Sequence, residues 1–183
     1  MILCHDSREV YTNRWMRVRE DAVEFPDGAH GIYGVVEKPD FVGIVPVDTA
    51  GCIHLVQQYR YPVQGRYWEI PQGSWEDRPG VDPEKVALAE LREETGLSAG
   101  HLTRVGHLFA AYGFSNQGYH LYVATDLKQG EAAREPTESD MISRGFTVPE
   151  IRRMIAEGQI KDATTIAAFG YLLLTTDFAS VFA

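Results

Sequence analysis

The amino-acid sequence predicts an α+β fold in which a sheet is sandwiched by helices. Short strand-like runs separated by Gly and Pro dominate the first part of the chain, and helical patterns recur in the second part. The 183 residues suffice for one compact domain with a small appendage. Hydrophobic residues make up 44% of the chain, so a packed core can form and extensive disorder is excluded.

The N-terminal segment is expected to contain only β-structure. Residues 8–38 form short strands, separated by turn-forming residues: Pro26-Asp27-Gly28, Gly31 and Gly34. A strand-rich segment of this size is too small to fold alone. We place a joint at Lys38-Pro39-Asp40, which divides the chain into an N-terminal β segment, residues 1–40, and a main domain, residues 41–183.

The main domain is expected to begin with a β-hairpin. The apolar runs Phe41–Val47 and Cys52–Tyr59 flank the turn-forming residues 48–51. A further strand over Arg66–Ile70 ends at Pro71-Gln72-Gly73.

A helix follows. Asp82 is suited to the N-cap position and Pro83 to the first helical position, and Gly96 ends the helix. Two strand-like runs come next, Leu102–Ala110 and Tyr119–Ala124.

The rest of the chain predicts a loop and two helices. Residues 126–140 are polar and are expected to form a mobile loop. Ile151 and Met154 mark an amphipathic helix that stops near Gly158, and Asp162 caps a final apolar helix.

Composition excludes several classes of protein. The formal net charge of -9 argues against non-specific binding of nucleic acid. Cys4 and Cys52 show no CxxC pairing, so neither a disulfide framework nor a zinc cluster is indicated. The N-terminus lacks the pattern of a signal peptide, and the apolar run 166–174 is too short for a membrane span. We expect a cytoplasmic protein with no membrane partner.

The most informative stretch is a helix rich in carboxylates. Glu90, Glu93 and Glu94 occupy neighbouring positions on one helical face. The adjacent face is apolar and is expected to anchor the helix: Ala87, Leu88 and Leu91. Mg²⁺ prefers oxygen ligands and would turn the repulsion between these acids into a binding site. The alternative is a solvated Glu-rich face, because Glu is a good helix former.

The surroundings of these acids resemble the Nudix box, G-x5-E-x7-R-E-U-x-E-E-x-G-U with U apolar. Gly73 stands at its start, and its end matches at six positions: Glu90, Leu91, Glu93, Glu94, Gly96 and Leu97. The run from Trp68 to Gly73 is similar to the strand and turn that precede the box in the ADP-ribose pyrophosphatase branch. The resemblance covers residues 41–175 and implies a Nudix-like α/β/α sandwich with a mixed sheet, preceded by a small antiparallel β subdomain.

Three features depart from the family pattern. The span from Gly73 to Leu97 is two residues longer than the box allows. Val81 and Ala89 replace a Glu and an Arg that commonly pair in the family, and an apolar contact could replace that tie. The loop around Tyr112 lacks the acid that ADP-ribose pyrophosphatases often carry there, which leaves the general base open.

The resemblance implies Mg²⁺-dependent hydrolysis (Mn²⁺ being a second candidate ion) of the pyrophosphate bond of nucleoside diphosphate sugars, ADP-ribose included. The products would be a nucleoside monophosphate and a sugar phosphate. The implied metal ligands are the three helix carboxylates of Glu90, Glu93 and Glu94 and the backbone carbonyl of Gln72. Glu93, Glu138 and Asp140 are the candidate catalytic acids, the last two as loop acids that could approach the attacking water.

Other residues are candidates for substrate binding. Arg60 resembles a family arginine that contacts phosphate or ribose, although a surface arginine at a strand end is equally common. Glu69 is a candidate for the site or, alternatively, a cross-strand partner of Arg60 or Arg66. Aromatic side chains could stack on the base, and the candidates are Tyr33, Tyr59, Tyr61 and Trp68. Tyr112 is a further candidate for substrate binding.

The resemblance further implies a homodimer in which the N-terminal strands pack across the subunits. Two other functions remain open. One is a sensor that binds a nucleotide sugar without cleaving it, and the other is hydrolysis of dinucleoside polyphosphates or RNA caps. A decapping enzyme would be expected to carry a basic track for RNA, and the charge balance offers none.

Overall fold

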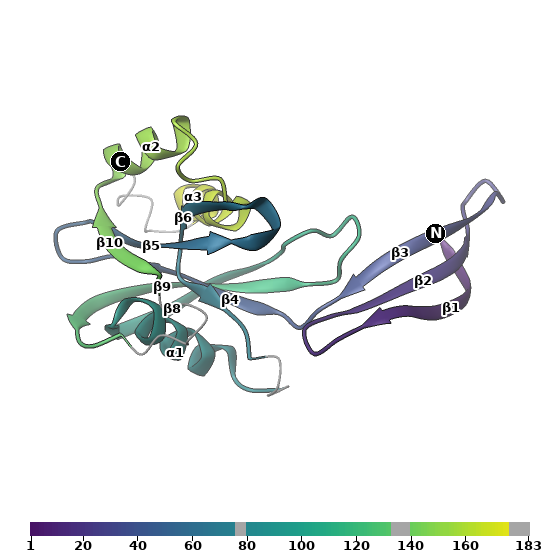
Figure 1. Cartoon of the computed structure of the whole chain (residues 1–183), viewed down its shortest axis with the longest axis horizontal. Helices are drawn as coiled ribbons and strands as arrows, with labels where there is room; N and C mark the ends of the chain where they lie inside the picture. The colour runs from purple at the N-terminus through teal and green to yellow at the C-terminus, as the bar shows by residue number, and fades with distance from the viewer. Residues whose placement is uncertain (76–79, 133–139, 176–183) are drawn as a thin grey trace.

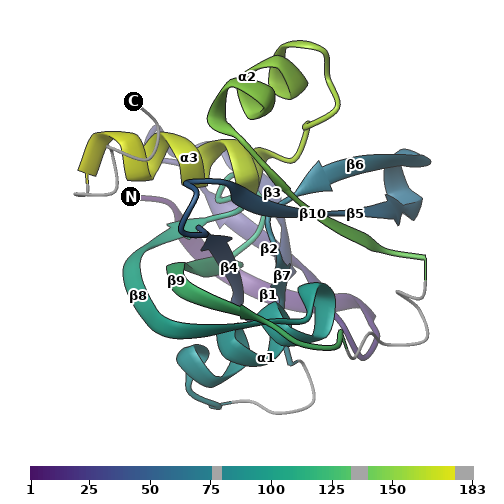
Figure 2. The ribbon, with the colours of Figure 1, turned by 90° about the vertical axis from the view of Figure 1, so that its left-hand side faces the viewer.

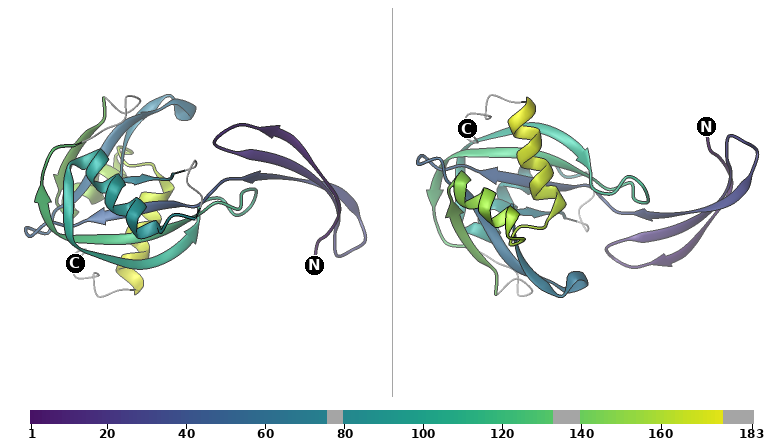
Figure 3. Two further views of the ribbon diagram at one scale, coloured as in Figure 1. Left: turned by 90° about the horizontal axis from the view of Figure 1, so that it is seen from below. Right: turned by 90° about the horizontal axis from the view of Figure 1, so that it is seen from above.

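The computed structural model describes residues 1–75, 80–132 and 140–175 and shows an α+β fold. In the main body, one helix lies on one side of the sheets and two helices lie on the other (Figures 1 and 2). An N-terminal sheet projects from this body as a separate lobe (Figure 3). This arrangement confirms the expected sandwich with a preceding antiparallel β subdomain.

The projecting lobe is a three-stranded antiparallel sheet in the order β1-β2-β3. Its strands are β1 (Leu3–Thr12), β2 (Arg17–Glu24) and β3 (His30–Glu37). The turn at Pro26-Asp27-Gly28 is confirmed, but Gly31 and Gly34 lie inside β3 and do not interrupt it. At Gly31 the missing side chain leaves room for the ring of Phe25, which a Cβ would meet at 2.7 Å.

The central sheet is mixed and has the order β7-β4-β9-β8. Its strands are β4 (Phe41–Pro46), β7 (Gln72–Gly73), β8 (Leu97–Phe109) and β9 (Gly118–Gln129). Strands β4 and β9 are parallel, whereas β7 and β8 run antiparallel to their neighbours. Gln72 and Gly73, expected in a turn, therefore form a short strand at the sheet edge.

A second three-stranded sheet has the order β10-β5-β6. Its strands are β5 (Ile53–Arg60), β6 (Gly65–Glu69) and β10 (Ile142–Phe146), and the 3-10 helix η1 (Tyr61–Val63) joins β5 to β6. The expected hairpin between the first two strands of the main domain is wrong, because β4 and β5 belong to different sheets. Both edges of β4 are already paired with β7 and β9, and an isolated bridge joins Val47, just after β4, to Ile53 at the start of β5.

The polar loop expected over residues 126–140 begins later than predicted, because its first residues belong to a strand. Strand β9 continues to Gln129, and β8 already begins at Leu97, directly after the helix C-cap. The long antiparallel ladder between β8 and β9 therefore includes the first polar residues of that segment. Residues 133–139 lie outside the described part of the chain.

Within the described residues, three α-helices complete the body: α1 (Pro83–Thr95), α2 (Val148–Ala156) and α3 (Ala163–Thr175). As expected, Asp82 caps α1, and Gly96 ends it with a φ of 77°. A capping box formed by Thr147 and Glu150 begins α2, and the Asp162 carboxylate accepts the Thr165 backbone N–H at the start of α3. In the described ranges, no helix has both the length and the hydropathy that a membrane span requires.

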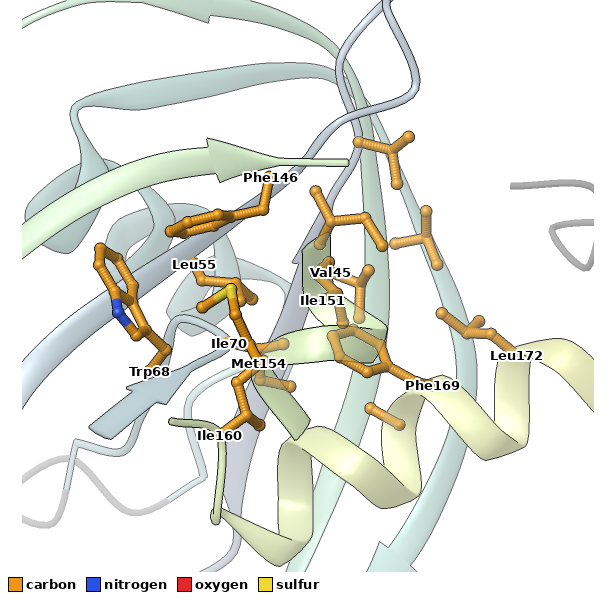
Figure 4. Close-up of a cluster of buried hydrophobic side chains, with 14 of the residues drawn as sticks. Val45, Leu55, Trp68, Ile70, Phe146, Ile151, Met154, Ile160, Phe169 and Leu172 are labelled. Atoms are coloured by element: carbon orange, nitrogen blue, oxygen red, sulfur yellow. The ribbon is translucent and has the colours of Figure 1, made fainter. Parts of the chain in front are cut away.

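Two hydrophobic cores hold the layers together. On the side of α2 and α3, the core joins both sheets to these helices, and the Trp68 and Phe146 rings form a T-shaped pair at a centroid distance of 4.7 Å (Figure 4). On the other side, α1 packs on the central sheet through Val86, Ala87 and Leu91. Leu88, expected on the same apolar face, is instead exposed.

Successive side chains along β4 and Val47, which follows it, point to opposite faces of the sheet and contribute to both cores. Val42 and Ile44 point to the α1 side, and Val45 and Val47 point to the α2–α3 side. The central sheet is therefore buried on both faces, which holds α1 rigidly against β4 and β7.

Candidate active site

A cleft of about 770 Å³ opens beside α1. The turn between β1 and β2, the link from β3 to β4, β5, β7 and α1 all contribute to its wall. The lining residues are Arg14, Trp15, Lys38, Phe41, Gln58, Arg60, Gln72, Gly73, Ser74, Trp75, Glu90, Glu93 and Gln117. The N-terminal lobe therefore reaches the cleft within one chain.

The carboxylates of α1 lie against β7. Glu94 is 1% exposed, and one of its carboxylate oxygens accepts a hydrogen bond from the Gln72 backbone N–H at 3.2 Å. Glu90 is buried, whereas Glu93 is partly exposed and lines the cleft. The structure thus places Glu90 and Glu94 against β7 beside Gln72, with Glu93 on the wall of the cleft, and the solvated Glu-rich face does not describe Glu90 or Glu94.

The close approach of Glu90 to β7 depends on Gly73. A Cβ at this position would lie 2.5 Å from the Glu90 carboxylate carbon. Because only glycine leaves this space open, the first residue of the box and its first matching acid are packed together. A cradle of this kind, lined by carboxylates and backbone, provides the hard oxygen donors that suit Mg²⁺.

Arg60 and Glu69 form a cross-strand ion pair between β5 and β6. Glu69 is only 2% exposed and also accepts a hydrogen bond from the Gln58 side chain at 2.8 Å. Burial raises the pKa of the Glu69 carboxyl, and the attraction of Arg60 offsets this only in part. The contacts of Glu69 are therefore those of the alternative interpretation, a cross-strand partner of Arg60. Arg60 also lines the cleft.

Of the two candidate loop acids, Asp140 is described, and it does not line the cleft. Asp140 pairs with Arg66, whose guanidinium also donates to the Asp140 backbone carbonyl at 2.6 Å. The hydrogen bond from Arg66 lowers the pKa of the Asp140 carboxyl. Asp140 is therefore engaged on β6 and does not line the cleft. Glu138 lies outside the described residues.

The cleft is lined by none of the aromatic residues expected to contact substrate, namely Tyr33, Tyr59, Tyr61, Trp68 and Tyr112. Trp68 is packed in the core, where Phe146 covers it. Tyr33 donates its hydroxyl hydrogen to the Gly113 carbonyl at 2.9 Å, and Tyr112 is 84% exposed on the loop between β8 and β9. Alternation along β6 turns Trp68 to the side opposite the cleft, which sequence inspection did not resolve.

The cleft contains aromatic and basic side chains that sequence reasoning missed. Trp15, Phe41 and Trp75 line it, as do Arg14 and Lys38. The Arg14 guanidinium lies over the Trp15 ring, 4.1 Å from its centroid. Of these residues, only Trp75 could have been predicted, because it follows Gly73 of the box by two positions. The others come from segments distant in sequence.

Comparison with known families agrees with this geometry. The NUDIX domain family matches residues 37–169, and the nucleoside diphosphate sugar hydrolase N-terminal domain matches residues 3–36. The chain therefore belongs to the NUDIX family. Within that family it is a pyrophosphohydrolase, an enzyme that acts on phosphoric anhydrides.

Curated relatives align over most of their length. An ADP-ribose pyrophosphatase of Mycobacterium tuberculosis is 34% identical, over 94% of this chain and 84% of the relative. An ADP-ribose pyrophosphatase of Bacillus subtilis is 30% identical, over 91% of this chain and 89% of the relative. A methanol dehydrogenase activator of Bacillus methanolicus is 31% identical, over 92% and 90% of the two chains.

The fold also matches a solved structure. A crystal structure of an ADP compounds hydrolase superposes with a TM-score of 0.81, covering 93% of this chain and 91% of that chain at 20% identity. At this identity the match concerns the fold alone.

Proposed function

We propose that this chain hydrolyses the pyrophosphate bond of nucleoside diphosphate sugars, ADP-ribose first among them, with Mg²⁺ as the cofactor. The products would be a nucleoside monophosphate and a sugar phosphate, AMP and ribose 5-phosphate for ADP-ribose. The observation that supports this most strongly is the cleft in which the α1 carboxylates face β7, surrounded by basic side chains. The names of two relatives, both ADP-ribose pyrophosphatases, favour ADP-ribose among nucleotide sugars.

Glu90, Glu93, Glu94 and the Gln72 backbone carbonyl would hold the divalent ion. When bound, Mg²⁺ (or Mn²⁺) supplies Lewis-acid stabilisation of the charge on the bridged phosphates. Glu94 is fixed by the Gln72 backbone N–H, and Glu90 by its contact with Gly73, so both carboxylates are oriented before substrate arrives. Glu93 is the more exposed of the three and is our candidate for accepting a proton from the attacking water.

The basic residues of the cleft would bind the substrate phosphates. Arg14, Lys38 and Arg60 come from three separate segments and line the same cavity as the carboxylates. The chain carries a formal net charge of -9, which repels a polyphosphate. The positive charges of these three side chains offset that repulsion at the cleft. The Arg60 guanidinium donates hydrogen bonds to Glu69, and these bonds fix its orientation at the cleft wall.

The aromatic residues of the cleft would take the base. Trp15, Phe41 and Trp75 offer planar faces, and base–aromatic stacking contributes about 1–3 kcal/mol per base. This assignment replaces the aromatic residues that the sequence suggested, since the cavity is lined by none of Tyr33, Tyr59, Tyr61, Trp68 and Tyr112.

Residues 1–40 would form a dimerisation segment, and residues 41–183 the catalytic domain. The projecting sheet displays large apolar side chains, among them Ile32, which is 69% exposed. Apolar surface of this kind is typical of interfaces. Light scattering should give the mass of a dimer, and Ile32→Glu should shift it towards the monomer; a monomeric wild-type protein would contradict this part of the proposal.

The enzymatic proposal is tested by incubating the protein and Mg²⁺ with ADP-ribose, UDP- and GDP-sugars, dinucleoside polyphosphates and capped RNA. We expect equal amounts of AMP and ribose 5-phosphate from ADP-ribose, and a loss of at least about a hundredfold in Glu93→Gln. Glu84→Gln is the matched control, because Glu84 lies exposed in the first turn of the same helix.

Other outcomes would reject the proposal in distinct ways. Tight binding of ADP-ribose without turnover in Mg²⁺ or Mn²⁺ would identify a sensor. Preferential cleavage of dinucleoside polyphosphates or caps would identify the other class of hydrolase. Equal activity of Glu93→Gln and Glu84→Gln would remove the α1 carboxylates from the mechanism.

A further inference from the structure

A second cluster of metal-ligand side chains lies beside the cleft and takes no part in the proposed hydrolysis. It consists of Asp40, in the link between β3 and β4, and of His107 on β8 and His120 on β9. The two histidines are direct cross-strand partners, with ring centroids 4.8 Å apart. Three segments therefore converge at this point.

The three side chains point their ligand atoms at one another. Asp40 Oδ2 lies 2.8 Å from His107 Nε2 and 3.9 Å from His120 Nε2. All three ligand atoms lie within 4.8 Å of one another. The other oxygen, Asp40 Oδ1, accepts the Gly118 backbone N–H at 2.8 Å, which holds the carboxylate with Oδ2 turned towards the histidines.

These separations suit a small tetrahedral ion. Zn²⁺ binds imidazole nitrogen and carboxylate oxygen at about 2.0–2.2 Å, so its ligand atoms lie about 3.4 Å apart. The distances from Asp40 Oδ2 to the two histidine Nε2 atoms, 2.8 and 3.9 Å, lie on either side of that value. We propose that Asp40, His107 and His120 form a binding site for Zn²⁺ or a similar transition-metal ion, separate from the carboxylate site on α1.

The chemistry of the ligands distinguishes the two sites. Two imidazole nitrogens and one carboxylate favour Zn²⁺ and its neighbours, whereas the all-oxygen set on α1 favours Mg²⁺. Three protein ligands would leave a fourth position for water. The backbone N–H of Gly118 is the outer partner of the carboxylate, as is common around metal ligands.

One neighbour competes with the metal ion. The Arg104 guanidinium donates to His120 Nδ1 at 2.9 Å, which places the hydrogen of the neutral ring on Nε2. A metal ion on Nε2 would require that hydrogen to leave and Arg104 to release Nδ1. Arg104 is exposed, so it can move away, and its removal should strengthen metal binding.

The site is tested by calorimetric titration of the full chain with ZnCl₂ in Mg²⁺-free buffer. We expect one ion to bind at this cluster, with affinity reduced at least about tenfold in His120→Ala and in Asp40→Asn, and increased in Arg104→Ala. His30→Ala is the control, because His30 belongs to another histidine cluster, on the N-terminal sheet. Circular dichroism of each variant verifies folding.

Co²⁺ provides a second readout. Its absorption spectrum should report tetrahedral nitrogen and oxygen coordination in the wild-type chain and in Glu93→Gln, but not in His107→Ala. The Glu93→Gln arm makes this result independent of the proposed hydrolysis. Equal Zn²⁺ affinity in wild type and His120→Ala, or loss of binding in His30→Ala instead, would overturn the proposal.

Discussion

At the scale of single residues, the missing side chain of Gly73 determines where the Glu90 carboxylate lies. The carboxylate occupies the space that a Cβ would fill, directly against β7. The proposed metal site therefore depends on the absence of a side chain at Gly73. Because the obstructed group is the end of a flexible side chain, a substitution here should disturb the site more than the fold.

Gly73→Ala is expected to displace the Glu90 carboxylate and to reduce Mg²⁺-dependent hydrolysis about tenfold or more, with a rise in the Mg²⁺ concentration for half-maximal rate. The free energy of unfolding should fall by less than about 1.5 kcal/mol. Gly34→Ala is the control, since no atom lies within 4 Å of its Cβ position. Unchanged Mg²⁺ dependence in Gly73→Ala would contradict this role.

The Arg60–Glu69 pair makes a second prediction at this scale. Removing the guanidinium in Arg60→Met leaves the buried Glu69 carboxylate with the hydrogen bond from the Gln58 side chain but without its charge partner, and should cost about 1–3 kcal/mol of stability. The double variant Arg60→Met/Glu69→Gln should lose less than the sum of the single variants. Urea denaturation measures all three, and strict additivity would argue against the coupling.

At the scale of elements, one hydroxyl joins α3 to the strand that leads into the site. Thr165 is fully buried, accepts the Ile70 backbone N–H at 2.9 Å, and donates to Asp162 Oδ2 at 2.7 Å. The start of α3 is thereby tied to the end of β6, just before β7. This connection helps to set the position of Gln72 relative to α1.

Thr165→Val preserves the shape of the side chain but leaves the Ile70 N–H without its acceptor. We expect a loss of about 1–3 kcal/mol in the free energy of unfolding, measured by urea denaturation. Thr103→Val, at an exposed position of β8, should have little effect. A Thr165→Val protein as stable as wild type would show that the tie is dispensable.

The N-terminal sheet should lose stability in acid through Glu37. Hydrogen bonds from Arg17 and then Arg19 lower the pKa of this β3 carboxyl below its ordinary value of 4.5. The stabilisation is therefore complete above about pH 4.5 and is lost as the pH falls through the lowered folded-state pKa. Unfolding of Glu37→Gln and wild type should differ most near neutral pH and converge in acid; a constant difference would contradict this.

At the scale of the whole molecule, local signals predicted the helix and its acids, but not the partners of the strands. The caps Asp82 and Gly96 and the spacing of the glutamates act within one helix, so the sequence showed them directly. The separation of β4 and β5 into two sheets depends on pairing with distant strands, which local patterns do not encode. For the same reason, Arg14 and Trp15 were not recognised as residues of the cleft.

The contribution of the N-terminal lobe to the cleft leads to a prediction for substrate binding. Trp15→Ala should raise the KM for ADP-ribose about tenfold with a smaller change in kcat, because a stacking contact binds ground state and transition state alike. Tyr61→Ala removes an exposed aromatic residue that does not line the cleft and should leave KM unchanged. Equal KM values for Trp15→Ala and wild type would exclude Trp15 from the binding site.

The most direct measurement is an anomalous difference map from crystals soaked in Mn²⁺ with a non-hydrolysable ADP-ribose analogue. We predict a peak bounded by Glu90, Glu93, Glu94 and the Gln72 carbonyl, in contact with the bridged phosphates. Manganese and ligand bound elsewhere, with these carboxylates bearing no ion, would contradict the account.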